Sequence, residues 1–212
     1  MTRVAELLLL LVILTSFLAL GTARVSACIR AVALQGLLLG LLPLALYPAG
    51  GAHIWGLAVG TVLVKAVVLP RFLNWAIREA AVRREVEPRV GYPMSLLVGV
   101  AAVAAAFAIS SRLPLPEQAH EMLVPAALAT VMLGLFMLTT RSKAVVQVVG
   151  YLILENGVYL FGLTHVERVP FLVEVGVLLD VFVAVFIMGI VVFHINREFD
   201  SLDSSHLSAL SD

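Results

Sequence analysis

The stretch from Ala144 to Leu163 reads AVVQVVGYLILENGVYLFGL, and its only charged residue is Glu155. About 20 mostly apolar residues in a helix are long enough to cross the ~30 Å hydrocarbon core of a bilayer. Glu155 follows Lys143 by about twelve residues, or roughly 18 Å along a helix, which is close to the middle of that layer. The stretch therefore predicts a membrane-spanning helix with an acid near its midplane.

Six further stretches have the same character, so we expect an all-α polytopic membrane protein with about seven transmembrane helices. Of the 212 residues, 61% are hydrophobic and only 13% are charged, which is about half the charged share of a soluble protein. The other expected spans are Val4–Gly21, Ala27–Tyr47, His53–Phe72, Pro93–Ser110, Met122–Thr140 and Phe171–His194.

The basic residues are unevenly divided between the two sides that seven alternating spans define. One side receives Arg24, Arg30, Arg71, Arg78, Arg83, Arg84, Arg89, Arg141, Lys143 and Arg197, and the other receives Arg3, Arg112 and Arg168. Lys and Arg are in excess on the cytoplasmic side of membrane proteins. We therefore expect the N-terminus outside and the C-terminus in the cytoplasm.

The N-terminus allows a second interpretation. Val25-Ser26-Ala27-Cys28 follows a Leu-rich run, as the cleavage site of a lipoprotein signal does. Arg24 interrupts that pattern, and the residues after Cys28 continue into another hydrophobic span. An uncleaved first span is therefore the preferred interpretation.

Several classes of chemistry have no residues to support them. Cys28 is the single cysteine, so a protein-borne iron–sulfur cluster or structural zinc site is excluded, since each needs about four ligands. No GxGxxG or P-loop pattern is present, and no nucleophile–base set can be assembled. We expect a non-catalytic chain without a cofactor and without a nucleic-acid partner.

Ionisable residues within the spans are few. Besides Glu155, Asp180 falls near the midplane of the last span, and Glu174 lies six residues earlier, nearer the outer surface. Lys65 lies in the inner half of the third span, and His53 lies at its outer end. Because charge inside a membrane is costly, such groups often form proton relays in pumps and transporters. The alternative is that they form buried ion pairs that hold the helices together.

Other residues near Glu155 are expected to serve packing. Asn156 can hydrogen-bond across helices, and Gly157 allows close approach of a neighbouring helix. Gly36–Gly40 and Gly56–Gly60 each form a GxxxG pattern, which is typical of ordinary helix packing in membranes.

Towards the C-terminus the chain carries a distinctive set of residues: Gly150-Tyr151, Glu155-Asn156-Gly157, Pro170, Val173-Glu174-Val175-Gly176, Asp180, Met188-Gly189-Ile190 and Phe199-Asp200-Ser201-Leu202-Asp203. This set resembles the hydrogenase-4 component E family, which comprises small membrane subunits of group 4 NiFe-hydrogenase complexes such as formate hydrogenlyase. Lys65, with Pro70 five residues on, resembles an earlier segment of the same family. The likeness is densest over residues 141–212.

The last three spans also resemble subunit K of NADH:quinone oxidoreductase and of multisubunit cation/proton antiporters. That family carries a buried glutamate on each of its last two helices. Asp180 falls at the position of the second acid, whereas Glu155 is displaced by about one turn when Asn156 is the anchor. The resemblance implies three regions: a four-helix membrane region over residues 1–121, a subunit-K-like region over 122–194 and a cytoplasmic polar tail over 195–212.

The resemblance also implies a setting in the cytoplasmic (inner) membrane of a prokaryote. The partners would be antiporter-like and quinone-subunit-like membrane subunits, together with cytoplasmic NiFe-hydrogenase and iron–sulfur subunits. Glu155 and Asp180 would serve proton translocation, with Lys65 and Glu174 extending the path. A purely structural subunit and a subunit of a multisubunit cation/proton antiporter are the alternatives. A stand-alone transporter is disfavoured because the sequence shows no internal repeat.

Overall fold

The structure is a computed structural model that describes residues 3–49, 51–79, 86, 89–113, 122–164 and 182–189. Within these ranges the chain is helical and contains no strand. The helices are α1 Arg3–Gly21, α2 Val25–Leu46, α3 Ala52–Thr61, the π-helix η1 Val62–Val68, α4 Leu69–Glu79, α5 Tyr92–Ser110, α6 Leu123–Thr140 and α7 Ala144–Leu163.

Six of the described helices are long and apolar enough to cross a membrane. The segments α3, η1 and α4 form one continuous span over Ala52–Arg78. These six spans coincide with the first six expected from the sequence to within a few residues, so the prediction of an all-α membrane protein is confirmed. The seventh expected span, Phe171–His194, lies largely outside the described residues, of which 182–189 are helical. The count of about seven stays a prediction, as do the orientation and the three regions.

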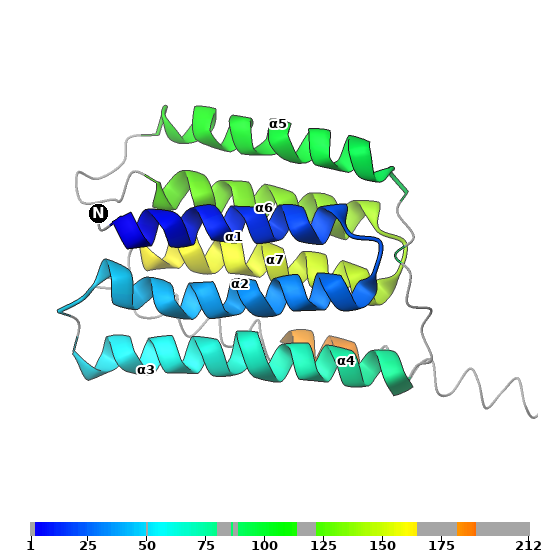
Figure 1. The fold of residues 1–212 in the computed structure, drawn as a ribbon, viewed down its shortest axis with the longest axis horizontal. Coiled ribbons are helices and arrows are strands. Elements are labelled where there is room, and N and C mark those ends of the chain that lie inside the picture. Colours follow the sequence, from blue (N-terminus) through cyan, green and yellow to red (C-terminus); the bar gives the residue numbers. More distant parts are fainter. Residues whose placement is uncertain are drawn as a thin grey trace, which may run out of the picture.

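The spans run side by side, alternating in direction (Figure 1). The span α3–α4 lies along one edge and α5 along the other, and α1, α2, α6 and α7 lie between them. The central α7 is the most buried span, and the two edge spans are the least buried. One end of the bundle, where α2 and α7 finish, is called the Tyr47 end below, and the opposite end is called the Arg141 end.

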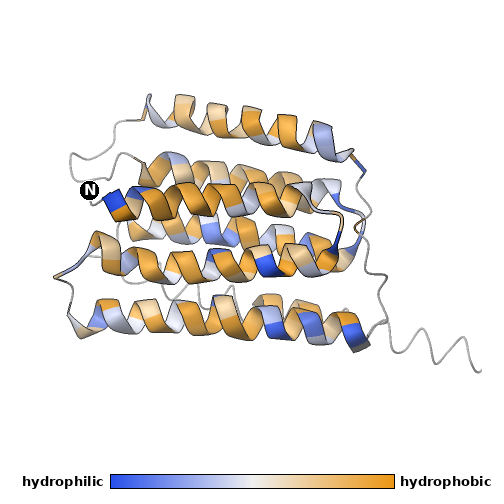
Figure 2. Cartoon of the chain, viewed as in Figure 1, coloured by the Kyte–Doolittle hydropathy of each residue, from blue (hydrophilic) through white to orange (hydrophobic). Residues whose placement is uncertain are grey.

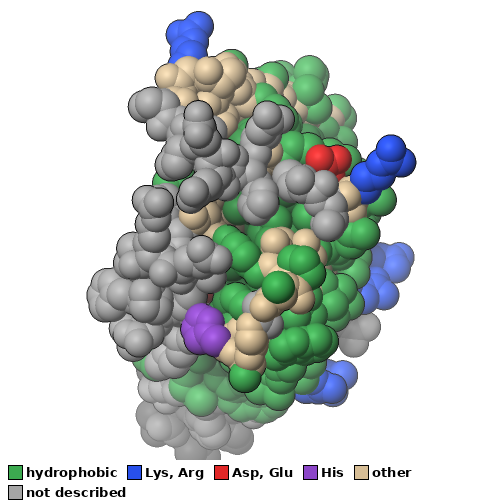
Figure 3. Space-filling view, turned by 90° about the vertical axis from the view of Figure 1, so that its left-hand side faces the viewer, with side chains coloured by type: hydrophobic (Ala, Val, Ile, Leu, Met, Phe, Trp, Pro, Cys, Tyr) green, Lys and Arg blue, Asp and Glu red, His purple; other side chains and the backbone are tan. Residues whose placement is uncertain are grey.

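Hydropathy along the helices agrees with immersion in lipid. Apolar residues dominate the length of every span, and polar residues gather at the Arg141 end and at a few places inside the bundle (Figure 2). Seen from the Tyr47 end, the described surface is mostly hydrophobic, and basic side chains project at its edges (Figure 3). The polar places inside the bundle are therefore the ones that need an explanation.

Glycines allow α6 and α7 to pack closely. Lipid provides no hydrophobic driving force between helices, so their association depends on such close packing. A Cβ on Gly134, Gly150 or Gly157 would lie less than 3 Å from a backbone atom of the facing helix. These three positions allow the two backbones to touch along most of their length. The contact fixes the rotation of α7 and therefore the direction in which its polar residues point.

A buried cation closes the Arg141 end. Arg141 is fully buried, and its Nη2 donates to the carbonyl of Leu20 at 2.7 Å. Its guanidinium carbon lies 5.6 Å from the ring centroid of Tyr92, within the range of a cation–π contact. Burial lowers the pKa of Arg141 below its ordinary value, but an arginine stays charged in proteins. Arg141 is therefore a fixed charge that joins α1, α5 and α6, and it cannot carry protons.

Candidate functional site

A lysine and a glutamate form an ion pair inside the bundle. Lys65 lies in the middle of the span Ala52–Arg78, and Glu155 lies near the middle of α7. The Nζ of Lys65 donates to Oε1 of Glu155, and the two side chains are only 5% and 2% exposed. Lys65 does not extend to the membrane surface, as its long side chain would permit, but ends on the acid. The structure thus brings together two of the ionisable residues singled out from the sequence.

The local winding around Lys65 is unusual for a spanning helix. Lys65 lies within the π-helix Val62–Val68, and π-helical turns occur mostly as short interruptions, frequently at functional sites. Pro70 follows closely and has no N–H to donate to the carbonyl of Ala66 four residues earlier. The missing hydrogen bond favours a departure from α-helical winding at this place.

Close packing from α2 constrains the same segment. A Cβ at Gly36 would lie 2.7 Å from the backbone carbon of Lys65, and one at Gly40 would overlap the side chain of Val62. The glycine face of α2 therefore lies directly on the π-helix. The lysine side chain extends past it towards α7.

A hydroxyl pair lies one turn away from the ion pair, towards the Tyr47 end. The hydroxyls of Thr61 and Tyr159 are 3.1 Å apart. Thr61 precedes Lys65 by four positions, and Tyr159 follows Glu155 by four. Each hydroxyl residue therefore lies on the same helix face as its member of the ion pair. The Nζ of Lys65 also lies 6.0 Å from the ring centroid of Tyr159, so the aromatic face adds to the stabilisation of the ammonium.

A second buried polar cluster ties α7 to α2 and α1. Gln35 donates from Nε2 to Oγ of Ser16 at 2.8 Å and to the carbonyl of Val12 at 3.1 Å. Asn156 donates from Nδ2 to Oε1 of Gln35 at 2.9 Å. Ser16, Gln35 and Asn156 are each 1% exposed. The neighbours Glu155 and Asn156 thus serve different contacts, one with α3–α4 and one with the α1–α2 pair.

The other candidates lie apart from this arrangement or outside the described residues. His53 is exposed near the start of α3, and it is about 18 Å along the helix from Lys65. Asp180 and Glu174 lie outside the described residues, so their roles stay predictions. Gly157 faces Val131 of α6. Among the described residues, no group of His, Cys, Asp and Glu could hold a metal ion.

Thr61 and Tyr159 were not predicted from the sequence. Their signal was present, because each lies four residues from Lys65 or Glu155 on a single helix face. A hydroxyl at that spacing became informative only when the two helices were seen to be neighbours.

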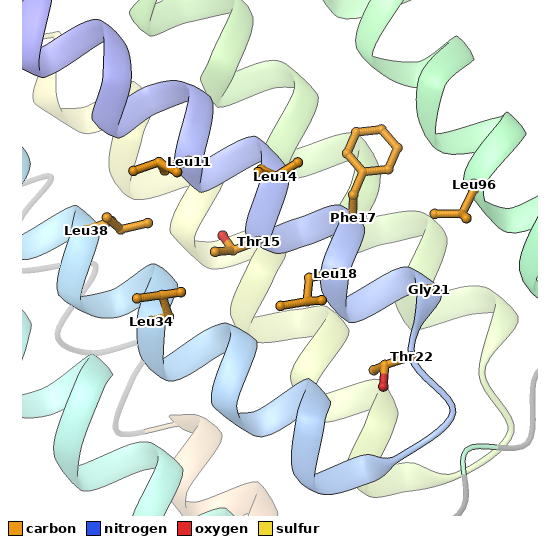
Figure 4. Close-up of a pocket in the computed structure, with 10 residues that line it drawn as sticks. All are labelled: Leu11, Leu14, Thr15, Phe17, Leu18, Gly21, Thr22, Leu34, Leu38 and Leu96. Carbon is orange, nitrogen blue, oxygen red and sulfur yellow. The ribbon is translucent and has the colours of Figure 1, made fainter.

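A groove between α1, α2 and α5 has a different character. It has a volume of about 620 Å³ and is lined by Leu11, Leu14, Thr15, Phe17, Leu18, Gly21, Thr22, Leu34, Leu38 and Leu96 (Figure 4). The hydroxyl of Thr15 already donates to the carbonyl of Val12 at 2.8 Å. No ionisable side chain lines the groove, so it offers no site for proton chemistry.

Comparison with known proteins finds that the chain is similar in sequence to several bacterial proteins. It is 34% identical over 203 residues to the Mycobacterium tuberculosis protein called "Uncharacterized protein Rv0085", and the match covers 94% of this chain and 92% of the relative. The chain belongs to the family of this mycobacterial protein.

More distant relatives carry a functional name. Hydrogenase-4 component E of Escherichia coli is 28% identical over 167 residues, which is 78% of this chain and 76% of the relative, and that of Shigella flexneri matches equally well. No family model matches the chain. No solved structure matches it significantly.

Proposed function

We propose that the chain is a non-catalytic membrane subunit of a hydrogenase-type complex and that its Lys65–Glu155 pair moves protons during coupling. The distant similarity to hydrogenase-4 component E supports the kind of complex. The buried ion pair between two spans carries the proposal of proton movement.

The pair has the properties that proton transfer requires. Burial favours the neutral form of a carboxyl and of an amine, whereas an opposite charge nearby favours the charged forms. Each group therefore responds strongly to the protonation state of the other. Intramembrane carboxylates and lysines that respond in this way recur in pumps and transporters.

A transfer cycle can be written with the protons balanced. Glu155 takes one proton from one side and becomes neutral, so the Lys65 ammonium loses its counter-charge. Lys65 then releases one proton towards the other side and becomes a neutral amine. The carboxyl proton of Glu155 passes to that amine, which restores the ion pair. One proton has crossed the middle of the membrane in each cycle.

Glu155→Gln tests this role because an amide keeps the shape of the side chain but cannot carry a proton. The variant replaces the chromosomal copy, and substrate-driven proton uptake is measured in membrane vesicles from those cells. Uptake per amount of chain in the membrane is expected to fall to the level of vesicles that lack the chain. Glu6→Gln, the same change in the first turn of α1, is the matched control and should leave uptake intact.

A purely structural subunit is the competing function, and the hydrogen bond from Asn156 to Gln35 of α2 favours it. In that case Glu155→Gln would lower the amount of assembled chain and leave uptake per assembled chain unchanged. Asp180→Asn, at a residue outside the described ranges, is tested by the same two measurements. Unchanged uptake in Glu155→Gln would overturn the proton-moving role of the Lys65–Glu155 pair, and unchanged uptake in Asp180→Asn would overturn that of Asp180.

A further inference from the structure

The polar residues of α7 follow a single line along the helix. Gln147, Tyr151, Glu155 and Tyr159 recur at every fourth position. Residues four apart lie on one helix face, and the line drifts by only about 40° at each step. Among the other side chains of α7 only Asn156 is polar, and it bonds towards α2 instead. A helix that crosses lipid has no need of such a line for its own stability.

Towards the Tyr47 end, the line continues as a series of hydroxyls. The Tyr159–Thr61 hydroxyl pair comes one turn after the ion pair. One further turn on, the hydroxyl of Tyr47 donates to the carbonyl of Leu163 at 2.9 Å. Leu163 is the last residue of α7 and Tyr47 directly follows α2, so this step reaches the end of the bundle.

Towards the Arg141 end, the line borders a cavity. Gln147 and Tyr151 line a space of about 190 Å³, whose other walls are Leu138, Val148, Phe182, Val183 and Phe186. These walls are mostly apolar, so Gln147 and Tyr151 are the side chains that can hold a water molecule in this space. Gln147 donates from Nε2 to the carbonyl of Arg141 at 2.9 Å, which joins this half of the line to the end of the bundle.

We propose that this line is a two-part proton path whose halves meet at the Lys65–Glu155 pair. The Gln147–Tyr151 cavity brings protons to Glu155, and the Tyr159, Thr61 and Tyr47 hydroxyls carry protons between Lys65 and the Tyr47 end. This inference rests on the proposed function. It adds the residues of both half-paths, which are polar but, apart from the tyrosines, cannot ionise.

The hydroxyl half works by exchange of protons. Lys65 passes a proton through a bound water to the hydroxyl of Tyr159, which gives its own proton to Thr61. Thr61 in turn releases a proton along the chain of hydroxyls and water that ends at Tyr47. Each hydroxyl receives one proton and gives one, so no residue of the half-path keeps a charge. The hydroxyls then rotate back for the next transfer.

Thr61 offers the sharpest test because one substitution replaces its hydroxyl by a methyl group of similar size and another removes its methyl group and keeps the hydroxyl. Thr61→Val removes the hydroxyl and Thr61→Ser keeps it. Proton uptake per amount of chain in the membrane is measured in vesicles from cells that carry each variant. Thr61→Val and Tyr159→Phe are expected to lower uptake several-fold, whereas Thr61→Ser stays near the parent value. Tyr92→Phe, which removes a tyrosine hydroxyl outside the line, is the control and should have no effect.

The outcomes separate this proposal from the proposed function. If Glu155→Gln abolishes uptake and Thr61→Val and Tyr159→Phe leave it unchanged, the hydroxyl path is overturned and the role of the ion pair stands. If Glu155→Gln leaves uptake unchanged, the proposed function fails and the path fails with it. Equal losses in Thr61→Val and Thr61→Ser would show that side-chain packing matters and the hydroxyl does not, which also overturns the path.

Discussion

At the scale of single residues, the buried Lys65–Glu155 pair carries a large desolvation cost. Removing two charges from water costs several kcal/mol for each ion, and their mutual attraction offsets that cost only in good geometry. The pair is sustained by the hydrogen bond between the groups and by the ring of Tyr159. A hydrophobic pair would fill the same space at lower cost, so stability alone gives no reason for these residues.

The ion pair leads to a prediction about stability. Lys65→Met leaves Glu155 as a buried acid without its counter-charge and should lower the free energy of unfolding by about 3–5 kcal/mol. Lys65→Met combined with Glu155→Gln should recover much of that loss, because no buried charge remains. The measurement is unfolding of the purified chain in detergent, followed by circular dichroism.

Arg112→Met is the control for this cycle. Arg112 is exposed just after the end of α5, and exposed surface charges contribute little to stability. Its removal should change stability little. If the losses in Lys65→Met and Glu155→Gln simply add in the double variant, the two groups are not coupled and the prediction is wrong.

At the scale of elements, the two GxxxG patterns proved different. Gly36–Gly40 lies against the π-helix, where there is no room for a side chain. At Gly56 and Gly60 an added Cβ meets no described atom within 4 Å. The spacing in the sequence is identical, and only the neighbours distinguish a packing glycine from one that is open. The same contact makes α2 the support that holds the Lys65 segment in place.

This difference gives a matched pair of substitutions. Gly36→Ala should destabilise the chain by about 1–3 kcal/mol, because overpacking displaces the backbone at Lys65. Gly60→Ala should be neutral or slightly stabilising, because alanine has a helix propensity higher than glycine by about 1 kcal/mol. Thermal unfolding in detergent measures both. Equal effects of the two changes would contradict the contact between α2 and the π-helix.

At the scale of the whole molecule, the two ends of the bundle differ in charge. Among the described basic residues outside the middle of the spans, two lie at the Tyr47 end, Arg3 and Arg112, and the others lie towards the Arg141 end, namely Arg24, Arg30, Arg71, Arg78, Arg89, Arg141 and Lys143. Arg141 itself is buried there. If the excess of basic residues faces the cytoplasm, the hydroxyl half of the proposed path opens to the outside. The direction of the path therefore depends on the orientation of the bundle.

Labelling of introduced cysteines measures that orientation. His53 and Arg78 are both exposed and lie near opposite ends of one span. In a Cys28→Ser background, His53→Cys should react with a membrane-impermeant maleimide added to intact cells, whereas Arg78→Cys should react only after the cells are opened. The reverse pattern would place the Arg141 end outside and would contradict the orientation expected from the sequence.

The sequence predicts those site residues whose signal is local, and it does not predict contacts between residues on different helices. Each of the four described ionisable or amide candidates, Lys65, Glu155, Asn156 and His53, was found from the sequence because a polar residue in an apolar run stands out by itself. Which of them meet was not predicted. The hydroxyls of Thr61 and Tyr159 were missed because threonine and tyrosine are common in spans and gain significance only from their neighbours.

The sequence by itself determined that the chain consists of membrane-spanning helices, and it placed six of them closely, because a run of about 20 apolar residues in lipid can satisfy its backbone only as a helix. It also placed Glu155 near the middle of its span, whereas Lys65, expected in the inner half of the third span, lies in the middle of the longer span Ala52–Arg78. Only the tertiary structure decided which helices are neighbours and how each is rotated. Those properties arise from contacts between distant residues, such as Gly36 on Lys65 and Gly157 on Val131, and no local pattern specifies them.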